Sequence, residues 1–207
     1  SHHPILFRPV RKLRGDNYVE RCLMAAIRNN IALYAAHTNM DAIRKGVNKK
    51  ICDKLGLVKT QILVPRMEEL RKLVFFVPVD HAVSVREKIF EAGAGHIGNY
   101  DQCSFNTAGD GTFRGSDETH PYVGKKGHLH YEKEIRVETI YPVYRESDVI
   151  KALLDAHPYE EVAYDIYPLT NAYQQAGSGM VGELPEPSSE KAFLMNLKKI
   201  FRTKIIR

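Results

Sequence analysis

The chain has no tryptophan, only three cysteines among its 207 residues, and no long apolar run. A helix that crosses a bilayer needs about 20 consecutive apolar residues, so the sequence predicts no membrane-spanning segment. Cys22, Cys52 and Cys103 form no Cys-x-x-Cys pair, which argues against a zinc ribbon and favours the reducing cytoplasm. No basic segment followed by an apolar stretch opens the chain, so we expect no signal peptide.

Charge of one sign is not concentrated anywhere. Lysine and arginine number 30 against 25 aspartates and glutamates, but the basic residues are spread over short groups at 8–14, 44–50 and 198–204. Such groups commonly form solvated faces, and neither stacking aromatics nor a known binding module accompanies them. The sequence therefore argues against a nucleic-acid partner.

At both ends of the chain, helix and strand patterns alternate. Towards the N-terminus we predict a helix capped by Asp16 and running to about residue 29, a buried strand at 31–36, a helix at 47–55 ended by Gly56, and a strand at 62–64 ended by Pro65. Towards the C-terminus the pattern predicts a strand at 180–184, a helix capped by Ser188 or Ser189, and the start of a strand at 203–206. This alternation is typical of an α/β layer, so we expect the two ends to form one domain.

The middle of the chain contains an internal repeat of strand, helix and strand. The first copy predicts strands at 73–77 and 102–107, and the second predicts strands at 135–141 and 163–167. The intervening helices are expected to turn apolar side chains inward: Val83, Ile89 and Phe90 in one copy, and Val149, Ile150, Leu153 and Leu154 in the other. Two such units make a ferredoxin-like βαββαβ sheet with helices on one face. Residues 107–127 are glycine-rich and predict a long loop or an extended hairpin.

These patterns together predict an α/β (α+β) fold in which one domain interrupts another. Residues 1–69 and 171–207 are assigned to the α/β domain, and residues 70–170 to the ferredoxin-like insertion. Because an inserted domain needs neighbouring ends, the chain near Leu70 is expected to lie close to the chain near Leu169.

Histidines in two segments suggest a metal site. His2 and His3 open the chain, and His37-Thr-Asn-Met-Asp41 follows the predicted strand at 31–36. Imidazole nitrogens and a carboxylate oxygen suit Zn²⁺, Mn²⁺ or Fe²⁺. Other interpretations remain open: His2-His3 as the remnant of an expression tag, His37 as a hydrogen-bonded core histidine, and Asp41 as a helix N-cap. The apolar run at 4–7, which follows the two histidines at once, is unlike the polar linker of a tag.

Four segments resemble one known family across nearly the whole chain. They are Ser-His-His-Pro-Ile-Leu-Phe at 1–7, His-Thr-Asn-Met-Asp at 37–41, Gly-Ala-Gly-His-Ile-Gly-Asn-Tyr-Asp-Gln-Cys-Ser-Phe at 93–105, and Gly-Ser-Gly-Met-Val-Gly-Glu-Leu-Pro at 177–185. The chain resembles the Nif-three-like family, often named GTP cyclohydrolase type-two homologues, in its bacterial branch with a PII-like (CutA-like) insertion. The third segment, with His-Pro-Tyr-Glu-Glu at 157–161, is specific to that insertion.

The resemblance implies a dinuclear metal site whose ligands include His2, His3 and Asp41. It implies two divalent ions (Zn, Mn or Fe) per subunit of the complete protein, a toroidal homohexamer, and a small-molecule or nucleotide ligand. The family takes a further histidine and glutamate from a C-terminal segment and has a segment before the paired histidines. Neither is present, so the chain looks truncated at both ends. The family's Gly-Gly-Val-Asn-Asp stretch reads Lys-Gly-Val-Asn-Lys at 45–49, which places positive charge near the expected site.

Two functions follow, and the sequence leaves open whether the protein is an enzyme. A dinuclear site lowers the pKa of a bridging water, as a hydrolase of GTP cyclohydrolase type requires for attack on a nucleotide or related small molecule. No phosphate-binding Gly-x-x-x-x-Gly-Lys-Ser/Thr loop and no Ser-His-Asp arrangement stands out. The alternative is a non-enzymatic metal-binding, metal-delivery or regulatory protein whose PII-like domain senses a ligand. His96, Asp101 and Cys103 are predicted to form a tight turn, with ligand contact as the alternative, and His157-Pro158 is predicted to end a helix.

Overall fold

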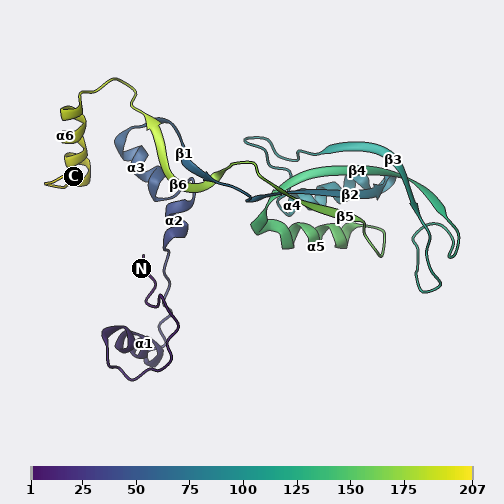
Figure 1. Cartoon of the computed structure of the whole chain (residues 1–207), viewed down its shortest axis with the longest axis horizontal. Helices are drawn as coiled ribbons and strands as arrows, with labels where there is room; N and C mark the ends of the chain where they lie inside the picture. The colour runs from purple at the N-terminus through teal and green to yellow at the C-terminus, as the bar shows by residue number, and fades with distance from the viewer. Residues whose placement is uncertain (1, 207) are drawn as a thin grey trace. The chain divides into compact units, whose positions relative to one another are not determined.

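The structure is a computed structural model that describes residues 2–206, and it contains two compact units. Unit 1 comprises the chain up to Arg66 and from Gln174 onward, and unit 2 comprises Met67–Tyr173. Each unit combines helices with antiparallel or paired strands, so the predicted α/β (α+β) class is confirmed (Figure 1). None of the helices in the described residues is both long and apolar enough to cross a membrane.

Unit 2 has the ferredoxin-like topology that the internal repeat predicts. Its elements are β2 (Leu70–Pro78), α4 (Ala82–Glu91), β3 (Phe105–Phe113), β4 (His130–Pro142), α5 (Glu146–Ala156) and β5 (Tyr164–Leu169), with a short 3-10 turn before each helix. The four strands lie in the order β3-β4-β2-β5, and every neighbouring pair is antiparallel. Leu70 pairs directly with Leu169, so the two ends of the insertion are neighbours, as expected.

The core of unit 2 lies between one face of this sheet and the two helices. Side chains of a strand alternate between faces, and Leu73, Phe75 and Val77 of β2 all point to the helix side, where they are fully buried. Val85 and Ile89 of α4 meet Val149 and Leu153 of α5 there. The predictions for Val83 and Leu154 are wrong, because these side chains are 57% and 46% exposed. Each lies one residue away from the buried stripe, about 100° around its helix.

Residues 107–127 are part of an extended hairpin, in which 107–113 belong to a strand and 114–127 to the loop that follows it. Strand β3 continues to Phe113, which pairs with His130, and only residues 114–129 connect the two strands. The strand begins at Phe105 and not at Gln102, whose φ of +53° is incompatible with an extended strand. The long hairpin therefore extends β3 and β4 well beyond α4 and α5, as Figure 1 shows.

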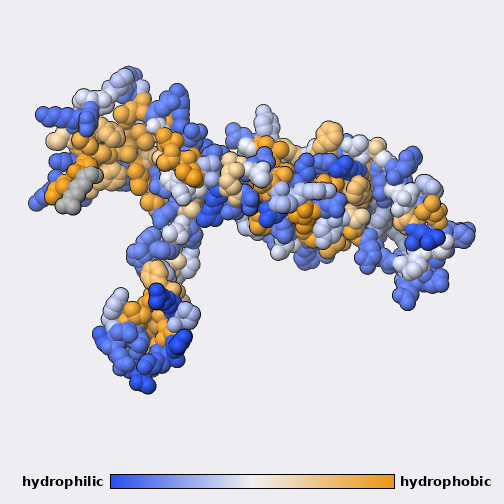
Figure 2. Space-filling view, in the orientation of Figure 1, coloured by the Kyte–Doolittle hydropathy of each residue, from blue (hydrophilic) through white to orange (hydrophobic). Residues whose placement is uncertain are grey.

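Unit 1 contains α1 (Tyr18–Arg28), α2 (Thr38–Ala42), α3 (Val47–Leu55), β1 (Val58–Arg66), nearly all of β6 (Tyr173–Glu183) and α6 (Glu190–Phe201). Strands β1 and β6 form a two-stranded sheet. Gly177 of β6 permits their close approach, because a Cβ at this position would lie 2.2 Å from the carbonyl oxygen of Val64. Figure 2 shows hydrophobic residues gathered on the surface around α3, α6, β1 and β6.

The N-terminal cap of α1 is Asn17 and not Asp16. The Asn17 side chain accepts a hydrogen bond from the Glu20 amide, and Glu20 accepts hydrogen bonds from the amides of Arg14, Gly15 and Asp16. The Asn17 side-chain amide also donates to Glu20, so the two side chains and the residues before the helix hold one another in place. The hydrogen bond from Arg14, with those from its neighbours, holds the pKa of the Glu20 carboxyl below its ordinary value.

Four further expectations for unit 1 differ from the structure. Residues 31–36 form no strand, and Ile31 and Leu33 are exposed. Residues 203–206 form no strand either, whereas α3 ends at Gly56 in the left-handed conformation, as predicted. Strand β6 begins at Tyr173, seven residues before the predicted start at 180. Strand β1 spans Val58–Arg66, so Pro65 lies within the strand and does not end it. Ser189 caps α6 through a hydrogen bond from the Ala192 amide.

His157 ends α5 and joins it to the sheet. Its side chain is buried, its Nε2 lies 2.9 Å from the Phe76 carbonyl oxygen, and its Nδ1 lies 3.1 Å from the Tyr159 amide nitrogen, which donates to it. Nε2 therefore carries the proton and Nδ1 accepts, which is the neutral imidazole. Burial lowers the pKa of His157 below its ordinary value, because the charged imidazolium would lose its hydration there.

Residues 67–173 expressed alone are expected to unfold in a single cooperative urea transition, because the whole core cluster lies within them. In this fragment Leu153→Ala should lower the free energy of unfolding by about 2–5 kcal/mol, since the side chain is fully buried. Its neighbour Leu154, which is half exposed, is the matched control, and Leu154→Ala should cost clearly less. A fragment without a cooperative transition would contradict the boundary.

The stability of unit 2 is expected to fall as the pH is lowered through the ordinary range of histidine. With its pKa lowered in the folded state, His157 binds its proton in the unfolded chain first, so its contribution is complete at neutral pH and is lost on acidification. Urea denaturation at pH 7.5 and 5.5 measures the difference, and His157→Gln should make it smaller. An equal pH dependence in the variant would show that other groups cause it.

Candidate metal centre

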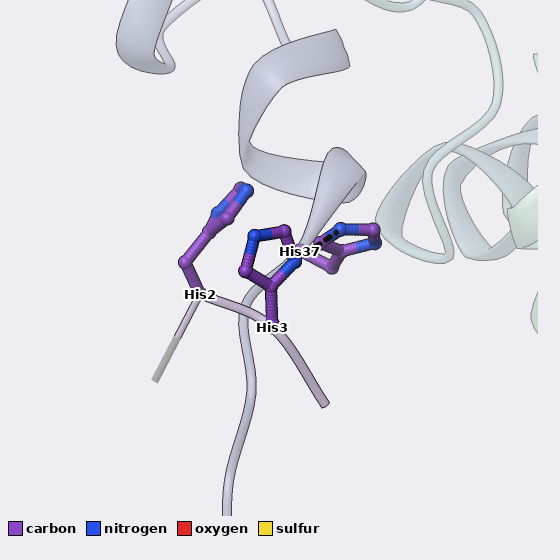
Figure 3. Close-up of side chains that lie close together, drawn as sticks. All are labelled: His2, His3 and His37. Atoms are coloured by element: carbon purple, nitrogen blue, oxygen red, sulfur yellow. Dashed lines mark hydrogen bonds between the residues drawn. The ribbon is translucent and has the colours of Figure 1, made fainter. Parts of the chain in front are cut away.

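Three histidines from two distant segments of unit 1 lie together. His2 and His3 are on the N-terminal segment and His37 is the N-cap residue of α2 (Figure 3). Each offers a ligand nitrogen, and these nitrogens all lie within 4.8 Å of one another. The His3 Nδ1 and the His37 Nε2 are 3.1 Å apart, which is a hydrogen bond in which one of the two nitrogens carries the proton. The three ring centroids are 4.7 to 5.0 Å apart.

The surroundings of the cluster suit a metal ion bound near the surface. His2 and His3 are exposed and His37 is half-buried, so solvent and ions reach the ring nitrogens. The Phe7 ring lies beside His3 and His37, with centroid distances of 5.9 and 5.8 Å. Nitrogen ligands lie about 2.0–2.1 Å from zinc, so two ligands of one ion are separated by at most about 4 Å. The observed spacing comes within a small side-chain rotation of that geometry.

Helix α2, which carries His37, is positioned by the residues that begin α3. Asn48 donates a side-chain hydrogen bond of 2.8 Å to the carbonyl oxygen of Asp41. Gly46 is buried against the end of α2, where a Cβ would lie 1.9 Å from the Met40 carbonyl oxygen. Only glycine therefore fits at position 46. The stretch at 45–49 thus acts on the site through the backbone of α2.

The two lysines of this stretch have different surroundings. Lys49 forms an ion pair with Asp53, one turn further along α3, so its charge is compensated within that helix. Lys45 is exposed. The expected positive charge near the site therefore comes from Lys45 more than from Lys49.

The structure brings together part of the ligand set predicted from the sequence. His2 and His3 are adjacent in the chain, and the third residue whose ligand atom lies close to theirs is His37, for which a hydrogen-bonded core histidine was the other interpretation. Asp41 is in α2, half-buried and one helical turn beyond His37, and is not among the three residues whose ligand atoms lie within 4.8 Å. Asp41 stays a predicted ligand. The sequence drew attention to the 37–41 segment because it follows the predicted strand at 31–36, whereas in the structure His37 is the N-cap residue of α2 and residues 31–36 form no strand.

The glycine-rich segment at 93–105 forms a tight turn in unit 2. Ile97 and Tyr100 exchange two backbone hydrogen bonds of 3.0 Å, and the Cys103 amide donates to the Gly95 carbonyl oxygen at 2.9 Å. The Cys103 Sγ lies 3.5 Å from the Asp101 carbonyl oxygen. Backbone hydrogen bonds therefore hold the segment in a tight turn, as the sequence predicts.

Comparison with known proteins identifies the family. The family model for Duf34/NIF3 (NGG1p interacting factor 3) matches residues 1–207. The chain belongs to this family. It is 44% identical over 202 residues to a GTP cyclohydrolase 1 type 2 homolog of Halalkalibacterium halodurans, covering 97% of this chain and 54% of the relative. A protein of the same name from Bacillus subtilis is 39% identical over 199 residues, covering 96% of this chain and 53% of the relative.

Solved structures agree with this assignment. A Bacillus cereus protein related to NIF3 superposes with a TM-score of 0.80 at 43% identity, covering 98% of this chain and 54% of the other. The Staphylococcus aureus protein SA1388, at 23% identity and a TM-score of 0.62, shares the fold. This NIF3-family chain spans about half the length of the relatives that it matches.

Gly46→Ala is expected to displace α2 and to lower the free energy of unfolding of unit 1 by about 1–3 kcal/mol, because the added methyl group collides with the Met40 carbonyl oxygen. Gly109→Ala is the matched control, since a Cβ there meets nothing within 4 Å. Denaturation followed by circular dichroism gives the stability, and NMR of the histidine ring protons reports His37. Unchanged His37 signals in Gly46→Ala would show that α3 does not position α2.

Proposed function

We propose that this NIF3-family chain binds a divalent metal ion through His2, His3 and His37, with Asp41 as a further ligand. The observation that carries the proposal is the convergence of three imidazoles from segments 34 residues apart. A histidine that only caps a helix or fills a core does not need the ring nitrogens of two other histidines beside its own at the surface. Three imidazoles favour zinc or iron, and an added carboxylate also suits manganese.

For the whole protein we propose a dinuclear-metal hydrolase of GTP cyclohydrolase type that acts on a nucleotide or a related small molecule. The name of the relatives, GTP cyclohydrolase 1 type 2 homolog, and the donor set at His2, His3 and His37 support this proposal. A metal ion held by these residues would lower the pKa of a bound water, which could then act as the nucleophile. His2 and His3 are exposed, so solvent reaches the site from their side. Helix α2, held by the hydrogen bond from Asn48, positions the site's other ligand, His37. Two ions per subunit, a homohexamer and a cytoplasmic location belong to the same proposal.

The second candidate is a metal-delivery or regulatory protein that performs no turnover. The exposure of His2 and His3 favours it, because an ion held near the surface exchanges readily with a partner. Nucleotide turnover by the metal-loaded whole protein separates the two functions. Hydrolysis of GTP that is abolished by chelation supports the enzyme, and tight metal binding without turnover supports the carrier.

Titration of this chain with Zn²⁺, followed by calorimetry, tests the site itself. His3→Ala and His37→Ala are each expected to raise the dissociation constant by about 10-fold or more, because each removes a direct ligand. His128→Ala is the matched control, since His128 is an exposed histidine of unit 2. Asp41→Asn should raise the constant if its carboxylate also binds the ion.

The variant His37→Ala also decides between a built site and a tag remnant. Two adjacent histidines at a chain end bind zinc weakly by themselves and without any contribution from position 37. Zinc affinity that is unchanged in His37→Ala would therefore reduce the site to His2 and His3 and would contradict the proposal.

A further inference from the structure

The sheet of unit 2 has a second face, and a cavity lies on it. The cavity measures about 570 Å³, within the range of about 300–1,000 Å³ typical of small-molecule sites. Phe76 and Glu134, on its floor, are in β2 and β4 at positions that alternate with the buried core residues, so they face away from α4 and α5. Strand β3, residues 114–122 of the hairpin connection and the 159–163 segment form its walls.

A buried carboxylate faces this cavity. Glu134 is only 7% exposed, and its Oε1 accepts a hydrogen bond of 2.9 Å from the Tyr159 hydroxyl. Within residues 2–206, no side chain or amide donates to its Oε2. Gly111 of β3 lets the carboxylate lie directly against the strand, because a Cβ on Gly111 would lie 2.1 Å from Oε2. No buried side-chain nitrogen or oxygen of the described residues lacks a partner, so Oε2 is the accessible oxygen of this largely buried carboxylate and can accept from a donor in the cavity.

Aromatic rings surround this acceptor, and they are held in place. The Tyr159 ring lies 5.8 Å from Phe113 and 6.2 Å from Tyr122, measured between centroids. Tyr122 is fixed by a 2.9 Å hydrogen bond between its hydroxyl and His81 Nε2. Burial and the bond to Glu134 raise the pKa of the Tyr159 hydroxyl above its ordinary value, so it remains a donor to the carboxylate.

The segment at 157–161, which the metal centre does not use, builds one wall of the cavity. His157 accepts from the Tyr159 amide and orients that residue toward Glu134. Glu160 accepts a 2.7 Å hydrogen bond from the His120 amide and so joins this wall to the hairpin connection. Glu161 lines the cavity as well. The wall is therefore formed before any ligand arrives, which lowers the entropy cost of binding.

Charges around the cavity favour a cation. Arg136 at the floor is engaged with Glu138 at 2.9 Å, and Asp110 at the rim is engaged with Lys133 at 2.6 Å. Arg114 is exposed at the mouth. Glu160 and Glu161 are exposed as well, so Glu134 is the one buried charged residue among the described residues that line the cavity. Aromatic faces attract cations in addition to packing against apolar groups.

We propose that this cavity binds a small organic cation, in which an ammonium group donates to Glu134 Oε2 and an apolar or aromatic body packs against Phe113, Tyr122 and Tyr159. This site is separate from the histidine cluster and does not depend on its function. It gives the insertion a ligand class of its own, namely amines with a compact hydrophobic group. A charge-assisted hydrogen bond in an apolar site supplies the selectivity for the charged form.

NMR titration of the ¹⁵N-labelled chain with three matched probes tests the proposal. The probes are phenethylamine, its neutral analogue 2-phenylethanol and the anion phenylacetate. Phenethylamine is expected to give saturable shifts of the amides of β3 and residues 159–163, with an affinity about 10-fold or more above that of the alcohol. Phenylacetate should give none. Equal affinities for the amine and the alcohol, or no saturable shift of these amides with the amine, would overturn the proposal.

Two variants and a control connect the binding to the carboxylate. Glu134→Gln should weaken phenethylamine binding by about 10-fold or more, because it removes the charge and keeps the shape. Glu132→Gln is the matched control two residues along β4, outside the cavity lining, and should leave binding unchanged. Gly111→Ala should weaken binding independently, since its methyl group would collide with the Glu134 carboxylate and displace it. Full affinity in a folded Glu134→Gln or Gly111→Ala variant would refute the assignment.

Discussion

The backbone pairing of β2 with β4 and β5 is the constraint on which the rest of unit 2 depends. With β2 fixed between two partners, its alternate side chains are committed to opposite faces. One set closes the core beneath α4 and α5, and the other forms part of the cavity floor. A shift of the register by one residue would exchange the two faces, so the core and the cavity are specified by the same hydrogen-bond ladder.

The histidine cluster of unit 1 has a different physical basis. Helix α2 has five residues, too few to be stable alone, so it depends on its neighbours. Its end is held by the Asn48 side chain and by the absence of a side chain at Gly46. The position of His37 therefore rests on a few backbone contacts rather than on a hydrophobic core. This explains why the stretch at 45–49 matters to a site that it does not itself enter.

The sequence predicts helices and strands well where a periodic apolar pattern packs against another apolar surface in the fold. Both strand–helix–strand repeats and the left-handed end of α3 at Gly56 are of this kind. The pattern at 31–36 looks equally apolar, yet Ile31 and Leu33 are exposed, since periodicity does not reveal whether a partner is present. The buried face of a short helix can also be predicted only to within about one residue, and for this reason Val83 and Leu154 were wrongly expected to point inward.

The two sites show the same limit. Residue type and spacing pointed to His2, His3 and the His37–Asp41 segment, but only the fold could show that His37 meets the paired histidines. Glu134 could not be recognised at all, because an acidic residue in an alternating strand reads as a solvent-facing one. Its burial results from Tyr159 and from the glycine at 111, which are distant in sequence.

The direct pairing of Leu70 with Leu169 has a consequence for how such chains change over generations. Because the two ends of the insertion lie side by side on adjacent strands, the intervening residues leave unit 1 and return to it at nearly the same point. A single in-frame deletion or replacement can therefore remove or exchange unit 2 without moving the residues of unit 1 on either side of it. The cavity of unit 2 and the histidine cluster of unit 1 can therefore change independently of each other.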